Sequence, residues 1–163
     1  MKITKNPVLG TWEMAESEQE HRLGAAPGME PCDAKRILIV DDEENLRSAI
    51  RKMLEADLSD CAFDVAANGE QAVERFTEGH PGIALMDLSM PVLDGEQAYY
   101  RIMDLCAEKN WQPPCVIFLT GYDPPLGVRN VVAGDPAHCL LQKPVRNQTL
   151  VMAVKKRMER YVR

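Results

Sequence analysis

The sequence predicts an α/β fold, a doubly wound parallel sheet of five strands with helices on both faces. Short, continuous apolar runs recur from Arg36 onward, and such runs are typical of strands that are buried on both faces. Each run is followed by a segment whose apolar residues recur at helical spacing. Strict alternation of strands and helices indicates parallel strands joined by right-handed crossovers.

The five strand–helix units follow one another along the chain. The strands are expected at residues 37–40, 63–67, 83–86, 116–119 and 139–142. The helices are expected at residues 46–54, 71–77, 95–108, 126–133 and 147–161. Because the fifth unit lies near the last residue, we expect residues 35–163 to form one domain with no second domain after it.

Residues 1–34 have a different composition. They contain several prolines and glycines, an acidic run and few large apolar residues, which favours a flexible extension. A short helix is expected near residues 12–23. Trp12 is an isolated large aromatic residue, which either docks on the domain or a partner, or stays exposed.

The composition narrows the class of protein. The 163 residues carry a net charge of -6, so the chain as a whole is a poor binder of nucleic acid. The apolar runs are too short to span a bilayer, and the N-terminus lacks the apolar core of a signal peptide. The five cysteines form no C-x-x-C pair, which argues against a zinc site or a disulfide framework. We expect a soluble, cytoplasmic protein with reduced thiols.

Polar residues follow four of the five expected strands. Asp41 and Asp42 follow the first strand, Asp87 the third and Thr120 the fourth, and Lys143 comes after the fifth. In a doubly wound sheet, ligands bind outside the carboxyl ends of the strands at the switch point. The three carboxylates would therefore face one another, where a divalent cation relieves their repulsion. Mg²⁺ suits such a site, because it prefers carboxylates, waters and a phosphate oxygen.

Each of these residues also has a structural explanation. Adjacent acids after a strand often cap the following helix, and Asp94-Gly95 alone is an ordinary turn or helix start. A threonine or a lysine can serve as a cap or as a surface charge. The functional interpretation rests on their coincidence at one end of the sheet.

The sequence from Arg36 to the end resembles the receiver domain of bacterial response regulators. The matching motifs are ILIVDDE at 37–43, MDLSMPVLDG at 86–95, FLTG at 118–121 and KP at 143–144. The resemblance implies a CheY-like, flavodoxin-like (βα)₅ fold with strand order 2-1-3-4-5. It also implies a role in two-component signal transduction.

The resemblance also implies roles for the site residues. Asp87 would accept a phosphoryl group from a histidine kinase, a phosphotransfer protein or a small phosphodonor. Mg²⁺ would be bound by Asp42, Asp87 and the backbone carbonyl of Ser89, with Asp41 reaching it through water. Lys143 and Thr120 would contact phosphoryl oxygens, and a cis Lys143–Pro144 bond is expected. Such a domain catalyses only its own phosphorylation and dephosphorylation, so we expect a regulatory protein and no enzyme of metabolism.

Two positions depart from the family pattern or stand out in it. Leu140 occupies the place of the usual switch aromatic, so we expect the signal to pass through the fourth and fifth strands and the loop 122–125. Tyr122 is expected beside the path of hydrolytic water, where it would slow loss of the phosphoryl group.

The output is expected to be a protein contact through the face formed by the fourth helix, fifth strand and fifth helix, with a homodimer left open. No direct contact with nucleic acid and no membrane insertion are expected. Three alternatives stay open: a Mg²⁺-dependent aspartyl-phosphate hydrolase, a scaffold that no longer takes phosphoryl, and a receiver cut from a larger hybrid protein. A hydrolase of that type usually has a second acid where this chain has Ser89.

Overall fold

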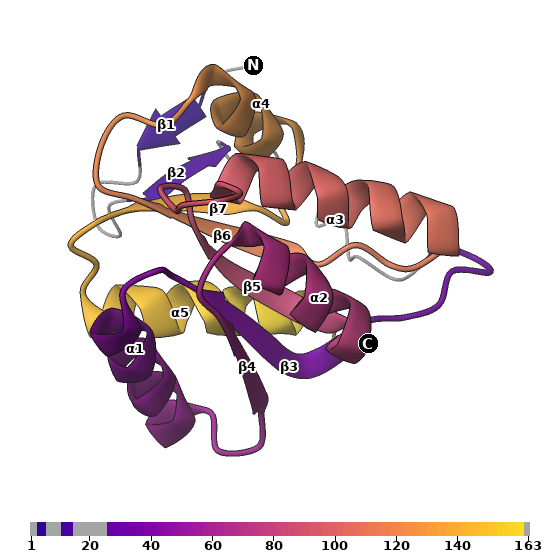
Figure 1. Cartoon of the computed structure of the whole chain (residues 1–163), viewed down its shortest axis with the longest axis horizontal. Helices are drawn as coiled ribbons and strands as arrows, with labels where there is room; N and C mark the ends of the chain where they lie inside the picture. Colours follow the sequence, from indigo (N-terminus) through magenta and orange to yellow (C-terminus); the bar gives the residue numbers. More distant parts are fainter. Residues whose placement is uncertain (1–2, 6–10, 15–25, 162–163) are drawn as a thin grey trace.

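The computed structural model describes residues 3–5, 11–14 and 26–161, and its centre is a sheet of parallel strands (Figure 1). The five parallel strands are β3 (Asp33–Val40), β4 (Ala62–Ala66), β5 (Pro81–Asp87), β6 (Cys115–Thr120) and β7 (Cys139–Gln142). Their order in the sheet is β4-β3-β5-β6-β7. Counted along the domain, this is the order 2-1-3-4-5 that the sequence predicted, and the fold class is confirmed.

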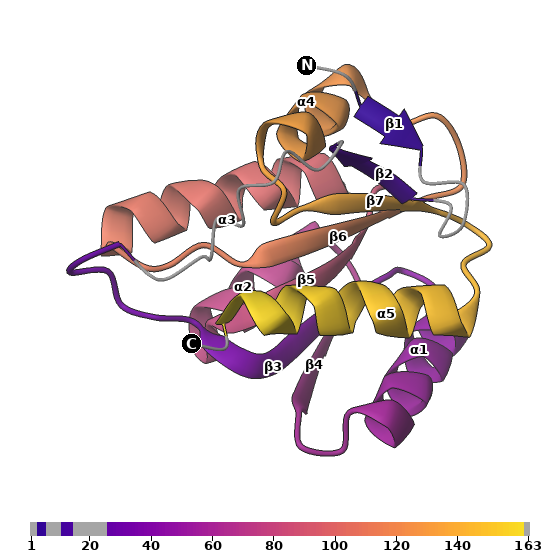
Figure 2. The same ribbon diagram turned by 180° about the vertical axis from the view of Figure 1, so that it is seen from behind.

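Each parallel strand is followed by a helix. The helices are α1 (Glu44–Asp57), α2 (Gly69–Gly79), α3 (Gly95–Lys109), α4 (Leu126–Gly134) and α5 (Asn147–Met158), with a final 3₁₀ turn η1 (Glu159–Tyr161). Figures 1 and 2 show α1 and α5 on one face of the sheet and α2 and α3 on the other. This doubly wound arrangement leaves the carboxyl ends of the strands free to form a site.

The apolar runs form two cores, one on each face of the sheet. Leu38 and Val40 pack toward α2, α3 and α4, whereas Ile37 and Ile39 pack toward α1 and α5. This division follows from the alternation of side chains along a strand. Because both faces are covered, all four side chains are at most 1% exposed. The central strands are therefore rigid supports for the polar residues that follow them.

The N-terminal region differs from the expectation. Strands β1 (Ile3–Lys5) and β2 (Thr11–Met14) form an antiparallel pair, and β2 pairs antiparallel with β7. The sheet therefore has seven strands (Figure 2). The predicted helix near residues 12–23 is wrong for residues 12–14, and its remainder lies outside the described residues. The edge of β7 offers unpaired backbone groups, and pairing with them outweighs the polar composition that favoured a chain without strands.

Residues 26–32 run along the sheet end opposite the carboxyl ends of the parallel strands. Glu30 forms an isolated parallel bridge with Trp111, and its carboxylate accepts a hydrogen bond of 2.7 Å from the Trp111 indole N–H. Cys32 is buried, and its backbone N–H donates to the side chain of Gln112. This part of the first 34 residues is packed on the domain.

Two further features concern the whole of the described chain. No helix within the described ranges is long and apolar enough to cross a membrane. All five cysteines are free thiols, and four of them are buried.

Candidate functional site

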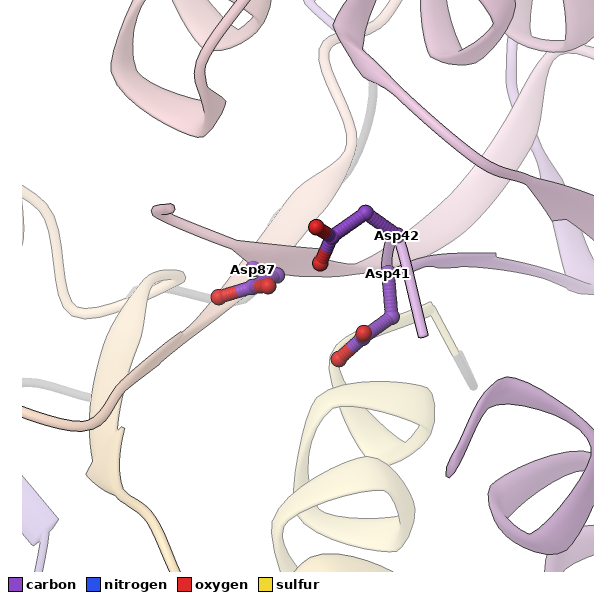
Figure 3. A group of neighbouring side chains, drawn as sticks. All are labelled: Asp41, Asp42 and Asp87. Atoms are coloured by element: carbon purple, nitrogen blue, oxygen red, sulfur yellow. The ribbon is translucent and has the colours of Figure 1, made fainter. Parts of the chain in front are cut away.

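Three carboxylates meet at the carboxyl end of the parallel sheet (Figure 3). Asp41 and Asp42 follow β3, and Asp87 is the last residue of the neighbouring strand β5. One oxygen from each carboxylate lies within 4.8 Å of the others. The sequence predicted this cluster from strand ends alone, and the parallel register of β3 and β5 is the reason that it forms.

Asp41 is held in place by its own chain. It is fully buried, and its Oδ1 accepts a hydrogen bond of 2.9 Å from the backbone N–H of Glu43. The guanidinium of Arg47 donates to the Asp41 backbone carbonyl at 2.6 Å. The N-cap residue of α1 is Glu43, without a side-chain cap, so the two aspartates are not the caps of this helix. The helix-capping role that the sequence suggested for these two aspartates is therefore not observed.

Asp87 ends β5 and is almost fully buried. Its Oδ1 accepts a hydrogen bond of 3.2 Å from the backbone N–H of Ser89. Burial raises the pKa of Asp87, and the charge of Asp41 raises it further, while Lys143 and the Ser89 N–H lower it. The net effect is a raised pKa, so Asp87 is a carboxylate whose negative charge is only partly compensated by the protein.

Lys143 is the cation that faces these carboxylates. Its ammonium lies 3.0 Å from Asp41 Oδ2 and 3.3 Å from Asp87 Oδ1. Burial lowers the pKa of Lys143, but the hydrogen bond to Asp41 and the charges of both aspartates outweigh burial and raise it overall. Lys143 therefore stays charged over the physiological range of pH.

Thr120 ends β6 beside β5, at the same edge of the sheet. Its hydroxyl donates to the Tyr122 carbonyl at 2.8 Å and accepts from the Tyr122 N–H at 3.2 Å. The hydroxyl is therefore engaged with its own loop, which leads into α4. The Thr120 carbonyl accepts from the backbone N–H of Lys143 at 2.7 Å, which ties the ends of β6 and β7 together.

The remaining predicted features fall around this cluster. The Lys143–Pro144 peptide bond is cis, as expected. Ser89 is exposed and lies two residues after Asp87, and a role for its carbonyl stays a prediction. Leu140 is buried among the side chains that pack toward α3 and α4. Tyr122 is 56% exposed, so it can contact an incoming molecule.

Sequence reasoning missed the positional role of Gly95. A Cβ at Gly95 would overlap the backbone carbonyl of Asp87, so only glycine lets α3 begin this close to the site. Asp94, just before it, forms a capping box with Gln97. The Asp-Gly pair therefore starts α3 and fixes the backbone behind Asp87. The contact between Arg47 and the backbone carbonyl of Asp41 was also missed. The available signal was the position of Arg47 at the start of α1, six residues after Asp41.

The sequence was also compared with protein-family models and with known proteins. The model described as "Response regulator receiver domain" matches residues 37–155. The chain is 39% identical over 74 residues to "Chemotaxis protein CheY" of Halobacterium salinarum, covering 45% of this chain and 60% of that protein. It is 44% identical over 69 residues to a protein-glutamate methylesterase/protein-glutamine glutaminase of Methanosarcina acetivorans, covering 42% of this chain and 20% of that protein. These alignments thus span less than two thirds of either relative.

Solved structures are similar over most of the chain. A CheY-like receiver domain protein from Methanospirillum hungatei matches with a TM-score of 0.64 and 24% identity, covering 77% of this chain and 94% of that one. A receiver domain protein from Clostridium thermocellum matches with a TM-score of 0.62 and 26% identity, over 77% and 94% of the two chains. The receiver domain of Saccharomyces cerevisiae Ssk1, crystallised with the histidine phosphotransfer protein Ypd1, is among the similar structures, with a TM-score of 0.64 and 24% identity over 78% and 92%.

Proposed function

Because the chain belongs to the response regulator receiver domain family, we propose that it is a phosphorylated switch of a two-component system with Asp87 as the phosphoacceptor. The observation that carries this proposal is that Asp87 lies within 4.8 Å of the other two carboxylates and 3.3 Å from the ammonium of Lys143. Phosphoryl transfer depends on a well-positioned nucleophile with cations beside it, and Asp87 is a buried carboxylate with Lys143 beside it.

In the proposed reaction, a carboxylate oxygen of Asp87 forms a bond to phosphorus as the phosphorus–nitrogen bond of a phosphohistidine breaks. The donor imidazole leaves with the electron pair of that bond and takes up a proton. Lys143 is within 3.3 Å of Asp87 and would neutralise charge on a phosphoryl oxygen. The Thr120 hydroxyl would donate to another oxygen after leaving the Tyr122 carbonyl.

The three carboxylates also fit a magnesium site. They supply hard oxygen ligands from a rigid sheet end, and their charges exceed what Lys143 can balance. We propose that Asp42 and Asp87 bind the ion directly, with Asp41 acting through water and Ser89 through its backbone carbonyl. Bound Mg²⁺ would supply positive charge to the transferring phosphoryl group. Lys143 keeps Asp41 oriented, and the Ser89 N–H keeps Asp87 oriented.

The partners belong to the same proposal. A histidine kinase or a phosphotransfer protein would supply the phosphoryl group, and the Ypd1–Ssk1 complex among the similar structures supports this class of partner. The output would be a protein contact at α4, β7 and α5, the fourth helix, fifth parallel strand and fifth helix of the domain, and a homodimer stays open. Phosphorylation would shift a two-state equilibrium that the partner reads. The protein would act by binding and not by turnover, in the cytoplasm, where free thiols are typical.

The test is phosphorylation with acetyl phosphate, read by intact mass. A single adduct that requires Mg²⁺ is expected for the wild type and not for Asp87→Asn. Asp104→Asn is a matched control, because Asp104 is an exposed aspartate on α3. An adduct that persists in Asp87→Asn would refute the proposal, and steady release of phosphate from many turnovers would favour the hydrolase alternative.

A further inference from the structure

The edge of the parallel sheet at β7 is covered by the chain itself. Strand β2 pairs antiparallel with β7, with Trp12 opposite Leu140 and Thr11 opposite Leu141. Strand β1 continues the sheet beyond β2. The family model matches residues 37–155, so this hairpin, β1–β2, precedes the part that matches the family. Its partner β7 is the strand that we propose for the output face.

The backbone of Leu140 faces the hairpin. The Lys143 N–H donates to Thr120 on β6, and backbone groups alternate between the two sides along a strand. Leu140 lies three residues before Lys143, an odd number, so its N–H and carbonyl point away from β6 and toward β2. An uncovered β7 would leave these groups as an open edge for a strand of another protein.

The chain that follows the hairpin is fixed on the domain at residues 28–30. The backbone of Glu30 is bonded on both sides, donating to Asn110 at 2.9 Å and accepting from Gln112 at 2.8 Å. The Asn110 side chain donates to the Gly28 carbonyl at 2.6 Å, and the Trp111 indole donates to the Glu30 carboxylate. A released hairpin would therefore stay attached to the domain through the chain that leads to residue 28.

The covered edge is connected to the phosphorylation site by two short paths. The first runs from β7, which ends at Gln142, directly to Lys143. The second runs from the Thr120 hydroxyl through Tyr122 to α4, which lies beside β2 (Figure 1). A phosphoryl group on Asp87 that draws Thr120 away from Tyr122 would disturb the loop that positions α4 against the hairpin.

We propose that the hairpin β1–β2 is an intramolecular cap on β7, docked in the unphosphorylated protein and loosened when Asp87 is phosphorylated. Loosening uncovers the β7 edge for pairing with a strand of the partner protein. The phosphorylation-dependent step rests on the proposed function of Asp87, whereas the docking of the hairpin does not.

Hydrogen exchange of the full chain, followed at the β7 amides, tests both parts. Trp12→Pro removes the backbone donor that faces Leu140, while Trp12→Ala keeps it. Exchange at Leu140 should be roughly tenfold faster in Trp12→Pro than in the wild type, and Trp12→Ala should stay near the wild type. When the wild type is treated with Mg²⁺ and excess acetyl phosphate, the Leu140 amide should exchange faster than in the untreated protein. The same treatment should leave the exchange rate of Leu140 unchanged in Asp87→Asn.

Each outcome decides one part of the proposal. Equal exchange at Leu140 in wild type and Trp12→Pro would overturn the docked cap. A complete phosphoryl adduct by intact mass with unchanged Leu140 exchange would overturn the coupling but leave the phosphoacceptor role intact. Absence of any adduct would contradict the function proposed for Asp87 and the coupled step with it, while the comparison of the two Trp12 variants would still decide on docking.

Discussion

Lys143 and Asp41 form an ion pair of 3.0 Å that joins the ends of β7 and β3 across the site. The same ammonium lies 3.3 Å from Asp87, so one cation serves two buried carboxylates. Asp42 adds a third carboxylate to the cluster. The site is therefore built with more negative charge than its lysine balances, and the predictions below follow from this imbalance.

Mg²⁺ should stabilise the folded protein. An ion that binds only the folded state adds about 2.7 kcal/mol to the free energy of unfolding at a hundred times its dissociation constant. Urea denaturation with and without Mg²⁺ measures the gain. Asp42→Asn should lose most of it, whereas Asp57→Asn, at the end of α1, should keep it. Equal gains in both variants would place the ion elsewhere.

Asp87→Asn should stabilise the metal-free protein at neutral pH, because it removes a buried negative charge that the protein compensates only in part. Burial raises the pKa of Asp87, so between its ordinary and its raised pKa the folded state binds more protons than the unfolded state. Wild-type stability should therefore fall as the pH rises through that window. The free energy of unfolding, measured as a function of pH, should fall less in the variant than in the wild type. An equal fall in both proteins would contradict the assignment of this pH dependence to Asp87.

Lys143→Ala should destabilise the metal-free protein by about 1–3 kcal/mol, because two buried carboxylates lose the partly buried cation that faces them. Mg²⁺ should recover part of this loss. The raised pKa of Lys143 means that its contribution in the wild type is complete below the ordinary lysine pKa and is lost as the pH rises through the raised value. Thermal unfolding with and without Mg²⁺ measures the destabilisation by Lys143→Ala and its partial recovery by the ion. Lys155→Ala is a control on an exposed lysine of α5.

Gly95→Ala should impair both stability and phosphorylation. The added Cβ would overlap the Asp87 carbonyl, so the start of α3 or the end of β5 must shift. A loss of about 1–3 kcal/mol is expected, together with a lower rate of adduct formation. Gly134→Ala is the matched control, since a Cβ at that position of α4 meets no atom within 4 Å. Equal effects of the two substitutions on the adduct rate would contradict a positional role for Gly95.

The core fold and the carboxylate cluster were predictable from the sequence for one physical reason. Strands buried on both faces must be continuously apolar, so the first polar residue after each run, such as Asp41 or Asp87, marks a carboxyl end. Parallel register then brings those ends to one edge. No side-chain geometry was needed to place Asp41, Asp42 and Asp87 together.

The N-terminal hairpin and the orientation of Thr120 were not predictable in this way. Strands β1 and β2 are short, and β2 is stabilised by pairing with the edge of β7, a partner more than a hundred residues away in the sequence. From the sequence, the Thr120 hydroxyl could point toward the site or toward its own loop. In the structure it donates to the carbonyl of Tyr122. The overlap that a Cβ at position 95 would make with the Asp87 carbonyl likewise depends on distances that sequence spacing alone does not give.

The most direct test of the central claim is to locate the phosphoryl group. Wild-type protein treated with acetyl phosphate and Mg²⁺ is reduced with borohydride, which converts a phosphorylated aspartate to homoserine, and its peptides are sequenced by mass spectrometry. We predict homoserine at position 87 alone, and none when Mg²⁺ is withheld. Homoserine at another aspartate, or at none despite an intact-mass adduct, would contradict Asp87 as the phosphoacceptor.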